Sequence, residues 1–131
     1  MGSSSNFETG RKGEELALKH YQDRGYSLVK QNFEYRLDNS RGRLGEIDLI
    51  FQKDGKLFLV EVKNRLSNKF GSPQEQITKQ KLRFLYRAWQ FFLSKFENQS
   101  YRNYLSQFDI AVVYNSEKVE IIENAYQFDG F

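Results

Sequence analysis

Cysteine is absent from this 131-residue sequence, and histidine occurs once, as His20. The absence of cysteine excludes a disulfide framework, a thiolate nucleophile and a cysteine-based zinc site. A single histidine also excludes histidine-cluster metal sites and disfavours a Ser-His-Asp triad. Any metal ion bound by this chain is therefore expected to have oxygen ligands, which favours Mg²⁺ or Mn²⁺.

Long apolar runs are also lacking. No stretch reaches the length of a membrane-spanning helix, and the N-terminus has no hydrophobic segment of the kind found in secretory signals. We therefore expect a cytoplasmic protein without a membrane partner. The net charge of +3, from 20 Lys and Arg against 17 Asp and Glu, is too small to identify a polyanion partner by itself.

The sequence does contain enough apolar side chains for a folded core. Hydrophobic residues make up 39% of the chain and aromatic residues 16%, a composition that excludes a disordered protein. The length fits one domain. We predict a flexible N-terminal tail at residues 1–9 and a single α/β domain at residues 10–131.

Hydrophobic periodicity predicts the order helix, three strands, helix, two strands. The first helix is expected at Arg11–Arg24, before Gly25. The helical repeat then places Glu14 on the same face as the apolar Ala17 and Tyr21. This order favours an α/β fold with a central mixed sheet and helices on both faces. The strands are predicted at Tyr26–Phe33, Glu46–Gln52, Leu57–Asn64, Ser106–Tyr114 and Val119–Ile122, and the second helix from Ser72 to about Phe96.

The second and third strands carry charged residues within apolar segments. The dipeptide Asp54–Gly55 predicts a two-residue hairpin turn, so that the numbers of paired residues sum to a constant. Asp48 then lies opposite Glu61, and Glu46 opposite Lys63, all on one face. Carboxylates on directly opposed positions, with Cβ atoms about 5 Å apart, repel each other by on the order of 3 kcal/mol. A divalent cation would relieve this repulsion, and the alternatives are a raised pKa or an ion-pair network that includes Lys63.

Two helical residues add to this charged group. Glu14 is the acid on the apolar face of the first helix, and Lys81 shares a face of the second helix with Leu85 and Ala88. Two acids that hold a metal ion beside a lysine suit phosphodiester hydrolysis, because the metal polarises the phosphate and the ammonium neutralises developing charge. The spacing D-x12-E-x-K is moderately specific for such a site.

The chain resembles the YraN-like uncharacterised family of small bacterial proteins in five segments between Gly10 and Val113: GRKGEELALKHYQDRGYSLVKQNF, GEIDLIF, LVEVKNR, FGSPQEQITKQK and QFDIAVV. That family is similar to the Holliday-junction-resolvase branch of the PD-(D/E)xK nucleases. The resemblance implies a restriction-endonuclease-like core, Mg²⁺- or Mn²⁺-dependent cleavage of branched or structured DNA, and a homodimer. Gln107 stands where the family has an arginine in its R-F-D segment.

Residue by residue, the resemblance implies that Asp48 and Glu61 are metal ligands, that Lys63 is the catalytic lysine and that Glu14 assists at the metal. The rival interpretation is a non-catalytic nucleic-acid-binding or scaffolding protein that keeps the fold. The intact set of acids and lysine favours the enzyme, because a binding protein does not need opposed acids that repel phosphate. The residues expected to contact nucleic acid are Arg43, Arg65, Gln76 and Lys81.

Overall fold

The structure is a computed structural model that describes residues 2–36, 44–65 and 79–126. The predicted order of elements is confirmed over these ranges. The elements are α1 (Gly2–Asp23), β1 (Ser27–Arg36), β2 (Leu44–Lys53), β3 (Lys56–Arg65), α2 (Lys79–Ser94), the short 3₁₀ helix η2 (Phe96–Tyr101), β4 (Leu105–Tyr114) and β5 (Lys118–Tyr126).

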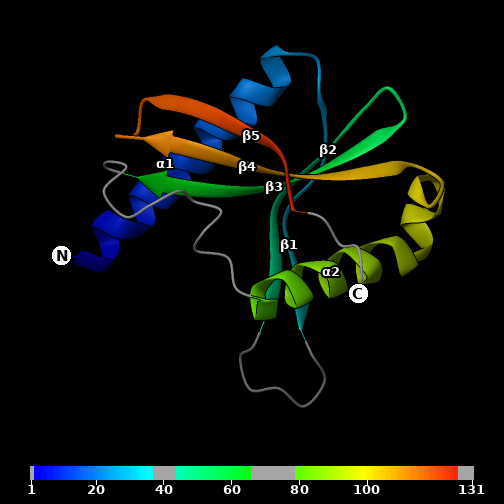
Figure 1. The fold of residues 1–131 in the computed structure, drawn as a ribbon. Coiled ribbons are helices and arrows are strands. Elements are labelled where there is room, and N and C mark those ends of the chain that lie inside the picture. The colour runs from blue at the N-terminus through cyan, green and yellow to red at the C-terminus, as the bar shows by residue number, and fades with distance from the viewer. Residues whose placement is uncertain (1, 37–43, 66–78, 127–131) are drawn as a thin grey trace.

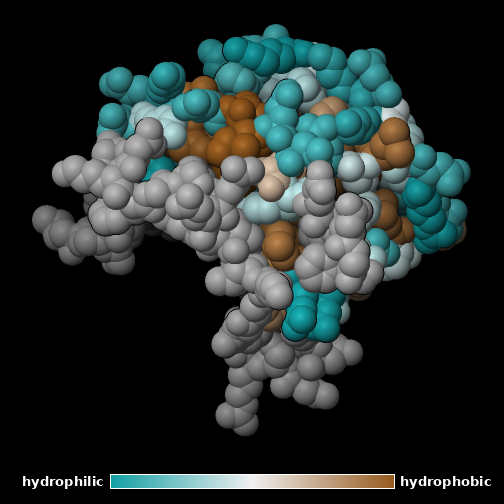
Figure 2. All heavy atoms as spheres, in the orientation of Figure 1, coloured by the Kyte–Doolittle hydropathy of each residue, from teal (hydrophilic) through white to brown (hydrophobic). Residues whose placement is uncertain are grey.

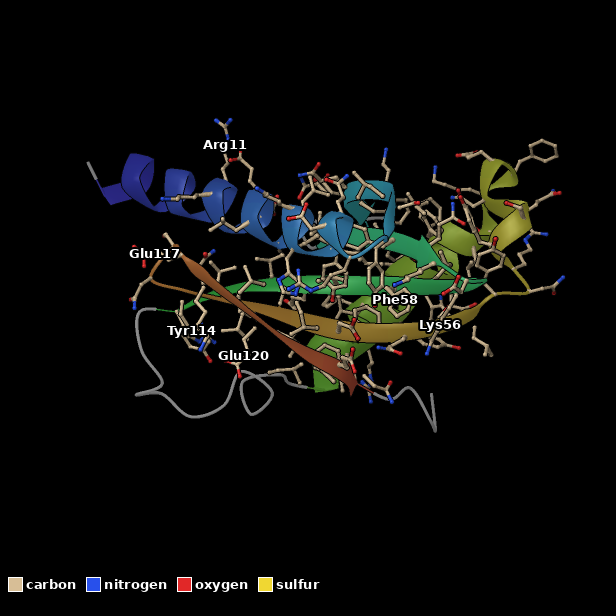
Figure 3. The ribbon with its side chains drawn as sticks, turned by 90° about the horizontal axis from the view of Figure 1, so that it is seen from above. Arg11, Lys56, Phe58, Tyr114, Glu117 and Glu120 are labelled. Carbon is tan, nitrogen blue, oxygen red and sulfur yellow. The ribbon has the colours of Figure 1, made fainter. Side chains whose placement is uncertain are left out.

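The five strands form one mixed sheet in the order β1-β2-β3-β4-β5. Among the described strands, only the neighbours β3 and β4 run parallel, and α2 lies in the long connection between them, as a parallel crossover requires. The helices α1 and α2 cover opposite faces of the sheet, as Figures 1 and 3 show together. The predicted α/β architecture is confirmed and is consistent with a restriction-endonuclease-like core.

Alternation along β3 divides the core into two layers. Phe58 and Val60 face α1, whereas Leu57 and Leu59 face α2, and all four are buried. Figure 2 shows hydrophilic residues along the upper edge of the molecule and apolar residues gathered beneath them. The layer under α1 consists of Ala17, Tyr21, Leu49, Phe51, Phe58, Val60 and Ala111.

The two helices differ from their predicted bounds in different ways. The backbone of α1 is helical from Gly2 rather than from Arg11, so the helix includes most of the segment expected to be a tail. Glycine, serine and asparagine are poor helix formers, which is why local propensity favoured the later start. The start of the second helix, predicted at Ser72, lies outside the described residues, and the described part of α2 ends at Ser94.

The expected face of α1 is confirmed. Ala17 and Tyr21 are fully buried against the sheet, and Glu14 is half-buried on the same face. In α2, Leu85, Ala88 and Phe92 are buried. Over the described ranges, neither helix is long and apolar enough to cross a membrane.

A candidate metal centre at the end of the hairpin

The predicted hairpin forms, but its ladder is shorter than the sequence suggests. Asp54 and Gly55 both have positive φ, 52° and 75°, as a type I′ turn requires. Pairing then follows the predicted register up to Leu49 and Val60, the last pair of the described ladder. The predicted opposition of Asp48 to Glu61 lies beyond that pair. Instead, the backbone N–H of Val62 donates to Asp48 Oδ2 over 2.8 Å, so a side chain replaces the next ladder bond.

The ladder ends because β2 changes face at Asp48. Leu49 packs in the layer under α1, whereas Ile47, two positions earlier, packs in the layer under α2. Strict alternation would place both on one side. On the neighbouring strand β1, Asn32 lies beside Asp48, between the partners of Leu49 and Ile47. Asn32 has a positive φ of 53°, which is irregular for a strand. The local change of face gives Asp48 a direction that simple alternation does not predict.

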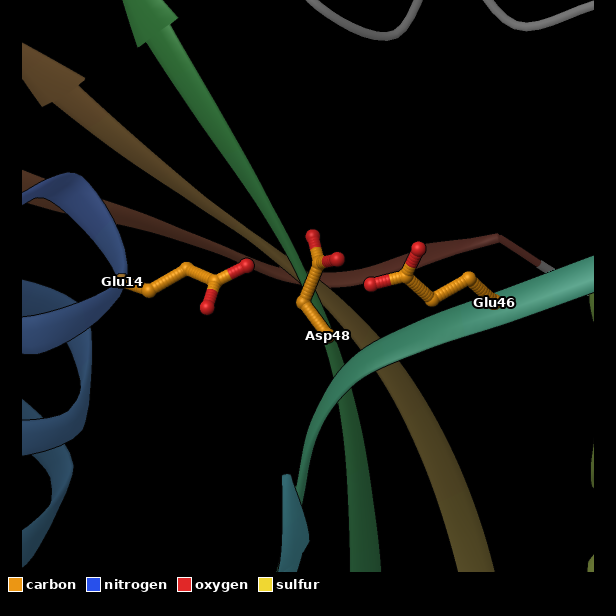
Figure 4. Close-up of side chains that lie close together, drawn as sticks. All are labelled: Glu14, Glu46 and Asp48. Atoms are coloured by element: carbon orange, nitrogen blue, oxygen red, sulfur yellow. The ribbon is translucent and has the colours of Figure 1, made fainter. Parts of the chain in front are cut away.

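Three carboxylates meet at this point. One ligand oxygen from each of Glu14, Glu46 and Asp48 lies within 4.8 Å of the others. Figure 4 shows Glu14 reaching from α1, Glu46 reaching from β2 and Asp48 between them. A cavity of about 640 Å³ adjoins the group and is lined by Gly10, Arg11, Glu14, Glu15, Gln31, Asn32, Glu34 and Glu46.

The electrostatics of this group favour a proton or a cation. Burial, followed by the charges of Glu46, Glu14 and Glu61, raises the pKa of Asp48 to about 7, although the hydrogen bond from the Val62 N–H opposes this shift. Burial and the charge of Glu46 likewise raise the pKa of Glu14. Ionising all three carboxyls is therefore costly unless positive charge comes between them.

Asn32 supports the group from β1. With its side-chain nitrogen turned toward the acids, the amide donates to Glu14 over 3.1 Å and to Glu46 over 3.2 Å. The hydrogen bond to Asn32 also opposes the rise in the pKa of Glu14. The amide thus holds two of the three carboxylates in place without supplying a charge.

These residues fit a divalent cation. All three side chains offer oxygen atoms, their spacing allows one ion to reach each of them, and the raised pKa of Asp48 marks a carboxylate without enough positive charge nearby. Mg²⁺ and Mn²⁺ prefer such oxygen ligands. Glu46 was not assigned as a ligand from the sequence, although its position two residues before Asp48 in GEIDLIF was a signal for it.

Glu61 and Lys63 form a separate arrangement. Lys63 Nζ lies 3.4 Å from Glu61 Oε1, and the Tyr126 hydroxyl donates to Glu61 Oε2 over 3.2 Å. Val62, between the two charged residues, packs against the layer under α1. Glu61 is not one of the three carboxylates whose oxygens lie within 4.8 Å of one another, and its charge is the weakest of the named contributions to the pKa of Asp48.

The residues predicted to contact nucleic acid are placed only in part. Arg65 is half-buried at the end of β3 and donates from Nη1 to the carbonyl oxygen of Asn64 over 3.2 Å. Lys81 lies in the first turn of α2, but its side chain is outside the described residues. Arg43 and Gln76 also lie outside them. These four contacts stay predictions.

Asp109, the acid of the QFD segment, has surroundings of another kind. It is 2% exposed and accepts hydrogen bonds from the Tyr21 hydroxyl over 2.9 Å, from Gln107 Nε2 over 2.8 Å and from the Asn124 N–H over 2.9 Å. These donors belong to α1, β4 and β5. Asp109 therefore joins three elements, and Gln107 provides a donor where the resembling family has arginine.

Comparison with known proteins adds relatives but no activity. A model of the Uncharacterised protein family UPF0102 matches residues 13–113. The chain is 36% identical over 116 residues to a UPF0102 protein of Caldicellulosiruptor saccharolyticus, covering 88% of this chain and 90% of that protein. It is 35% identical over 126 residues to one of Vibrio campbellii, covering 95% and 97%. It is 32% identical over 122 residues to one of Thermodesulfovibrio yellowstonii, covering 93% and 98%.

Proposed function

The chain belongs to the uncharacterised protein family UPF0102, and we propose that it is a metal-dependent endonuclease that hydrolyses DNA phosphodiester bonds. The observation that carries the proposal is that carboxylate oxygens of Glu14, Glu46 and Asp48 lie close enough together to bind one cation. Partly buried acids that repel each other destabilise a purely structural site, whereas a site that holds a divalent ion needs their charges. The resemblance to resolvase-like nucleases supports branched or structured DNA as the substrate class.

The roles of the protein groups follow from their charges and positions. Glu14, Glu46 and Asp48 would hold Mg²⁺ or Mn²⁺, and Asn32 would keep the two glutamates in place. A bound cation supplies Lewis-acid polarisation of the phosphate and lowers the pKa of the attacking water. Lys63, whose side chain is 24% exposed, can present its ammonium to the phosphate and neutralise charge that develops there.

Cleavage of two DNA strands bears on the oligomeric state of the protein. Cutting both strands of a branched duplex requires two such centres, so we expect the active form to be a homodimer on DNA. Sedimentation of the protein with and without a four-way junction measures this directly.

A cleavage assay tests the proposed activity. The protein is incubated with linear, flapped and four-way-junction DNA in Mg²⁺ or Mn²⁺, beside the variants Asp48→Asn and Glu120→Gln. Asparagine keeps an oxygen that can accept from the Val62 N–H but removes the ligand charge, so we expect cleavage to fall roughly 100-fold or more. Glu120 is exposed on β5, on the side of the sheet away from α1 (Figure 3), and its variant should cleave like the wild type.

Two results would contradict the proposal. Equal cleavage by the wild type and Asp48→Asn would mean that the activity lies elsewhere or belongs to a contaminant. Tight binding to the junction with no metal-dependent cleavage would favour the non-catalytic nucleic-acid-binding protein instead.

A further inference from the structure

The outward side of α2 is basic and aromatic. The helix carries Lys79, Lys81, Arg83 and Arg87 and neither Asp nor Glu, although the whole chain has a net charge of only +3. Arg83, Arg87 and Phe91 are exposed and follow one another at intervals of four residues, so they lie along one side of the helix. This side of α2 therefore presents positive charge and, one turn further on, a ring that is 39% exposed.

A second ring extends this surface onto β1, beside which α2 lies (Figure 1). The ring centroids of Tyr35 and Phe91 are 5.0 Å apart, and their planes are inclined by 44°. The buried Phe33 lies behind Phe91, with centroids 6.1 Å apart, and the ammonium of Lys95 lies 5.1 Å from the centroid of Phe91, over its ring. The neighbouring rings therefore hold Phe91 in place at the surface. The α2–β1 surface consists of Tyr35, Arg83, Arg87 and Phe91.

The strand β1 joins this surface to the candidate metal centre. Asn32 and Glu34 line the cavity beside the three carboxylates. Phe33 and Tyr35, which alternate with them along the strand, contact Phe91 instead. Successive residues of a strand are about 3.3 Å apart, and β1 lies at an edge of the sheet. A strand of nucleotides that passes around this edge can therefore contact both the metal centre and the rings.

The chemistry of the α2–β1 surface matches an unpaired nucleic-acid strand. Proteins bind single strands by placing cationic side chains along the phosphates and aromatic rings against the bases. The bases of an intact duplex already stack on one another, so an exposed ring adds most to the binding of an unpaired base. A cation–π contact at an exposed site is weaker than base stacking, so a base can replace the Lys95 ammonium on Phe91, and the ammonium can pair with a phosphate.

Charge disfavours a protein in the same place. A second copy that docked symmetrically through the α2–β1 surface would bring Arg83 and Arg87 against the same residues of its partner, and like charges repel. An apolar partner would bury both guanidinium groups without an opposite charge, which is costly. A polyanion has neither disadvantage.

We propose that the α2–β1 surface binds an unpaired strand of the DNA substrate, with its arginines at phosphates and its rings against bases. The choice of DNA rests on the proposed function. The inference narrows the substrate class to branched DNA that carries unpaired nucleotides, such as a flap, in preference to fully paired DNA.

A binding experiment tests the role of the rings. Fluorescence anisotropy measures the affinity of the full chain for a labelled strand of thymidines and for a blunt duplex, in a chelator that prevents metal-dependent cleavage. The wild type should bind the single strand more tightly, and Phe91→Leu, which keeps an apolar side chain but removes the ring, should weaken that binding by about fivefold or more. Duplex binding should change by less than about twofold, because paired bases do not reach the ring.

The matched control is Phe96→Leu, the same substitution at a phenylalanine that is 82% exposed in η2. This variant should bind the single strand like the wild type. A wild type that does not bind the single strand, or equal weakening by Phe91→Leu and Phe96→Leu, would overturn the inference.

Salt dependence separates phosphate contacts from base contacts. Each phosphate contact to a single strand contributes about 0.7 to the steepness of log K against log salt. Arg87→Gln should lower the steepness by about this amount, whereas Phe91→Leu should weaken binding at unchanged steepness. Lys118→Gln, which removes the same charge from an exposed position on β5, should change neither quantity. Equal effects of Arg87→Gln and Lys118→Gln would contradict a phosphate contact at Arg87.

Sedimentation and circular dichroism of the DNA-free variants test the competing occupant. Phe91 and Arg87 are exposed, so both variants should keep the helical signal of the wild type. If the wild type is a dimer that Phe91→Leu converts to a monomer, the surface joins two copies of the chain and the inference is wrong.

Cleavage separates this inference from the proposed function. A protein that binds the single strand as expected and never cleaves DNA contradicts only the metal-dependent activity. A protein that cleaves flapped and linear DNA equally well, with unchanged rates in Phe91→Leu, contradicts only the inference. In active protein, Phe91→Leu should raise KM for flapped DNA by about fivefold with little change in kcat, because it removes binding and not chemistry.

Discussion

Asp48 and Asp109 are both acids in interior strands of the sheet, and both lie near α1, yet they have opposite surroundings. Asp109 accepts three hydrogen bonds. Burial of Tyr21, together with the charge of Asp109, raises the pKa of the Tyr21 hydroxyl far above its usual range, so the hydroxyl keeps its proton and donates to Asp109. Asp48 receives a backbone hydrogen bond from Val62 and faces other acids.

The difference separates an acid whose hydrogen bonds stabilise the fold from an acid that lacks positive charge nearby. A buried carboxylate whose oxygens are satisfied by donors contributes to the fold, because its desolvation is offset by charge-assisted hydrogen bonds. A nearly buried carboxylate surrounded by like charges lowers stability until something positive binds. Asp109 is of the first kind and Asp48 of the second.

The largest expected effect comes from making the same substitution at both acids. Asp109→Asn should lower the free energy of unfolding by about 2 kcal/mol, because charge-assisted hydrogen bonds from Tyr21 and its other donors are lost. Asp48→Asn, with a chelator at pH 8, should raise it by about 2 kcal/mol, because a repelled charge is removed. Urea unfolding followed by circular dichroism measures both. Changes of the same sign in the two variants would break the comparison.

A smaller effect is expected from pH. The pKa of Asp48 in the folded protein, about 7, is above its ordinary value of 3.8, so the folded state binds more protons than the unfolded state between these values. The contribution of Asp48 therefore lowers stability as pH rises through this window. From pH 5 to pH 7, the wild type without metal should lose about 2 kcal/mol relative to Asp48→Asn.

The control for this pH dependence is the cation. Saturating Mn²⁺ should flatten or reverse the relative loss in the wild type and leave Asp48→Asn unchanged, because binding stabilises the folded state that holds the ion. Parallel stability profiles of the two metal-free proteins between pH 5 and pH 7 would show that Asp48 does not titrate in this window.

The smallest expected effect concerns the helix that both acids contact. A Cβ at Gly13 would overlap with the side chain of Asn64, whereas a Cβ at Gly10 would meet nothing within 4 Å. Gly10→Ala should therefore stabilise the protein by up to about 1 kcal/mol through helix propensity. Gly13→Ala should lower the free energy of unfolding by about 1 kcal/mol, because the overlap with Asn64 outweighs the gain in helix propensity.

The two glycine variants also test the carboxylate group and Asp109 independently of each other. Gly13 precedes Glu14 directly, so displacing α1 at this point should weaken Mn²⁺ binding, while the Tyr21 end of the helix keeps its bond to Asp109. Calorimetric titration of both variants measures this. Stronger Mn²⁺ binding in Gly13→Ala than in Gly10→Ala would contradict the idea that close packing of α1 sets the position of Glu14.

Most of the fold was predictable because its signals are local. The Asp54–Gly55 turn, the periodicity of α1 and the apolar strands gave the correct order of elements and a mixed sheet between two helices. The start of α1 at Gly2 was missed, because Ser and Asn have low helix propensity and local rules do not include the rest of a long helix. Of the residues predicted for the site, Glu14 and Asp48 lie close together and Glu46 joins them, whereas Glu61 contacts Tyr126 and Lys63; their roles stay predictions.

The sequence by itself determined that acids and a lysine would occupy the apolar hairpin, and where its turn would lie. Only the tertiary structure decided which acids meet. Continued pairing in the register of the hairpin would have placed Asp48 opposite Glu61, but β2 changes face at Asp48, beside the positive φ of Asn32. The physical reason is that the direction of a side chain at such an irregularity depends on the neighbouring strand and on helix packing, and neither is encoded in the period of one strand.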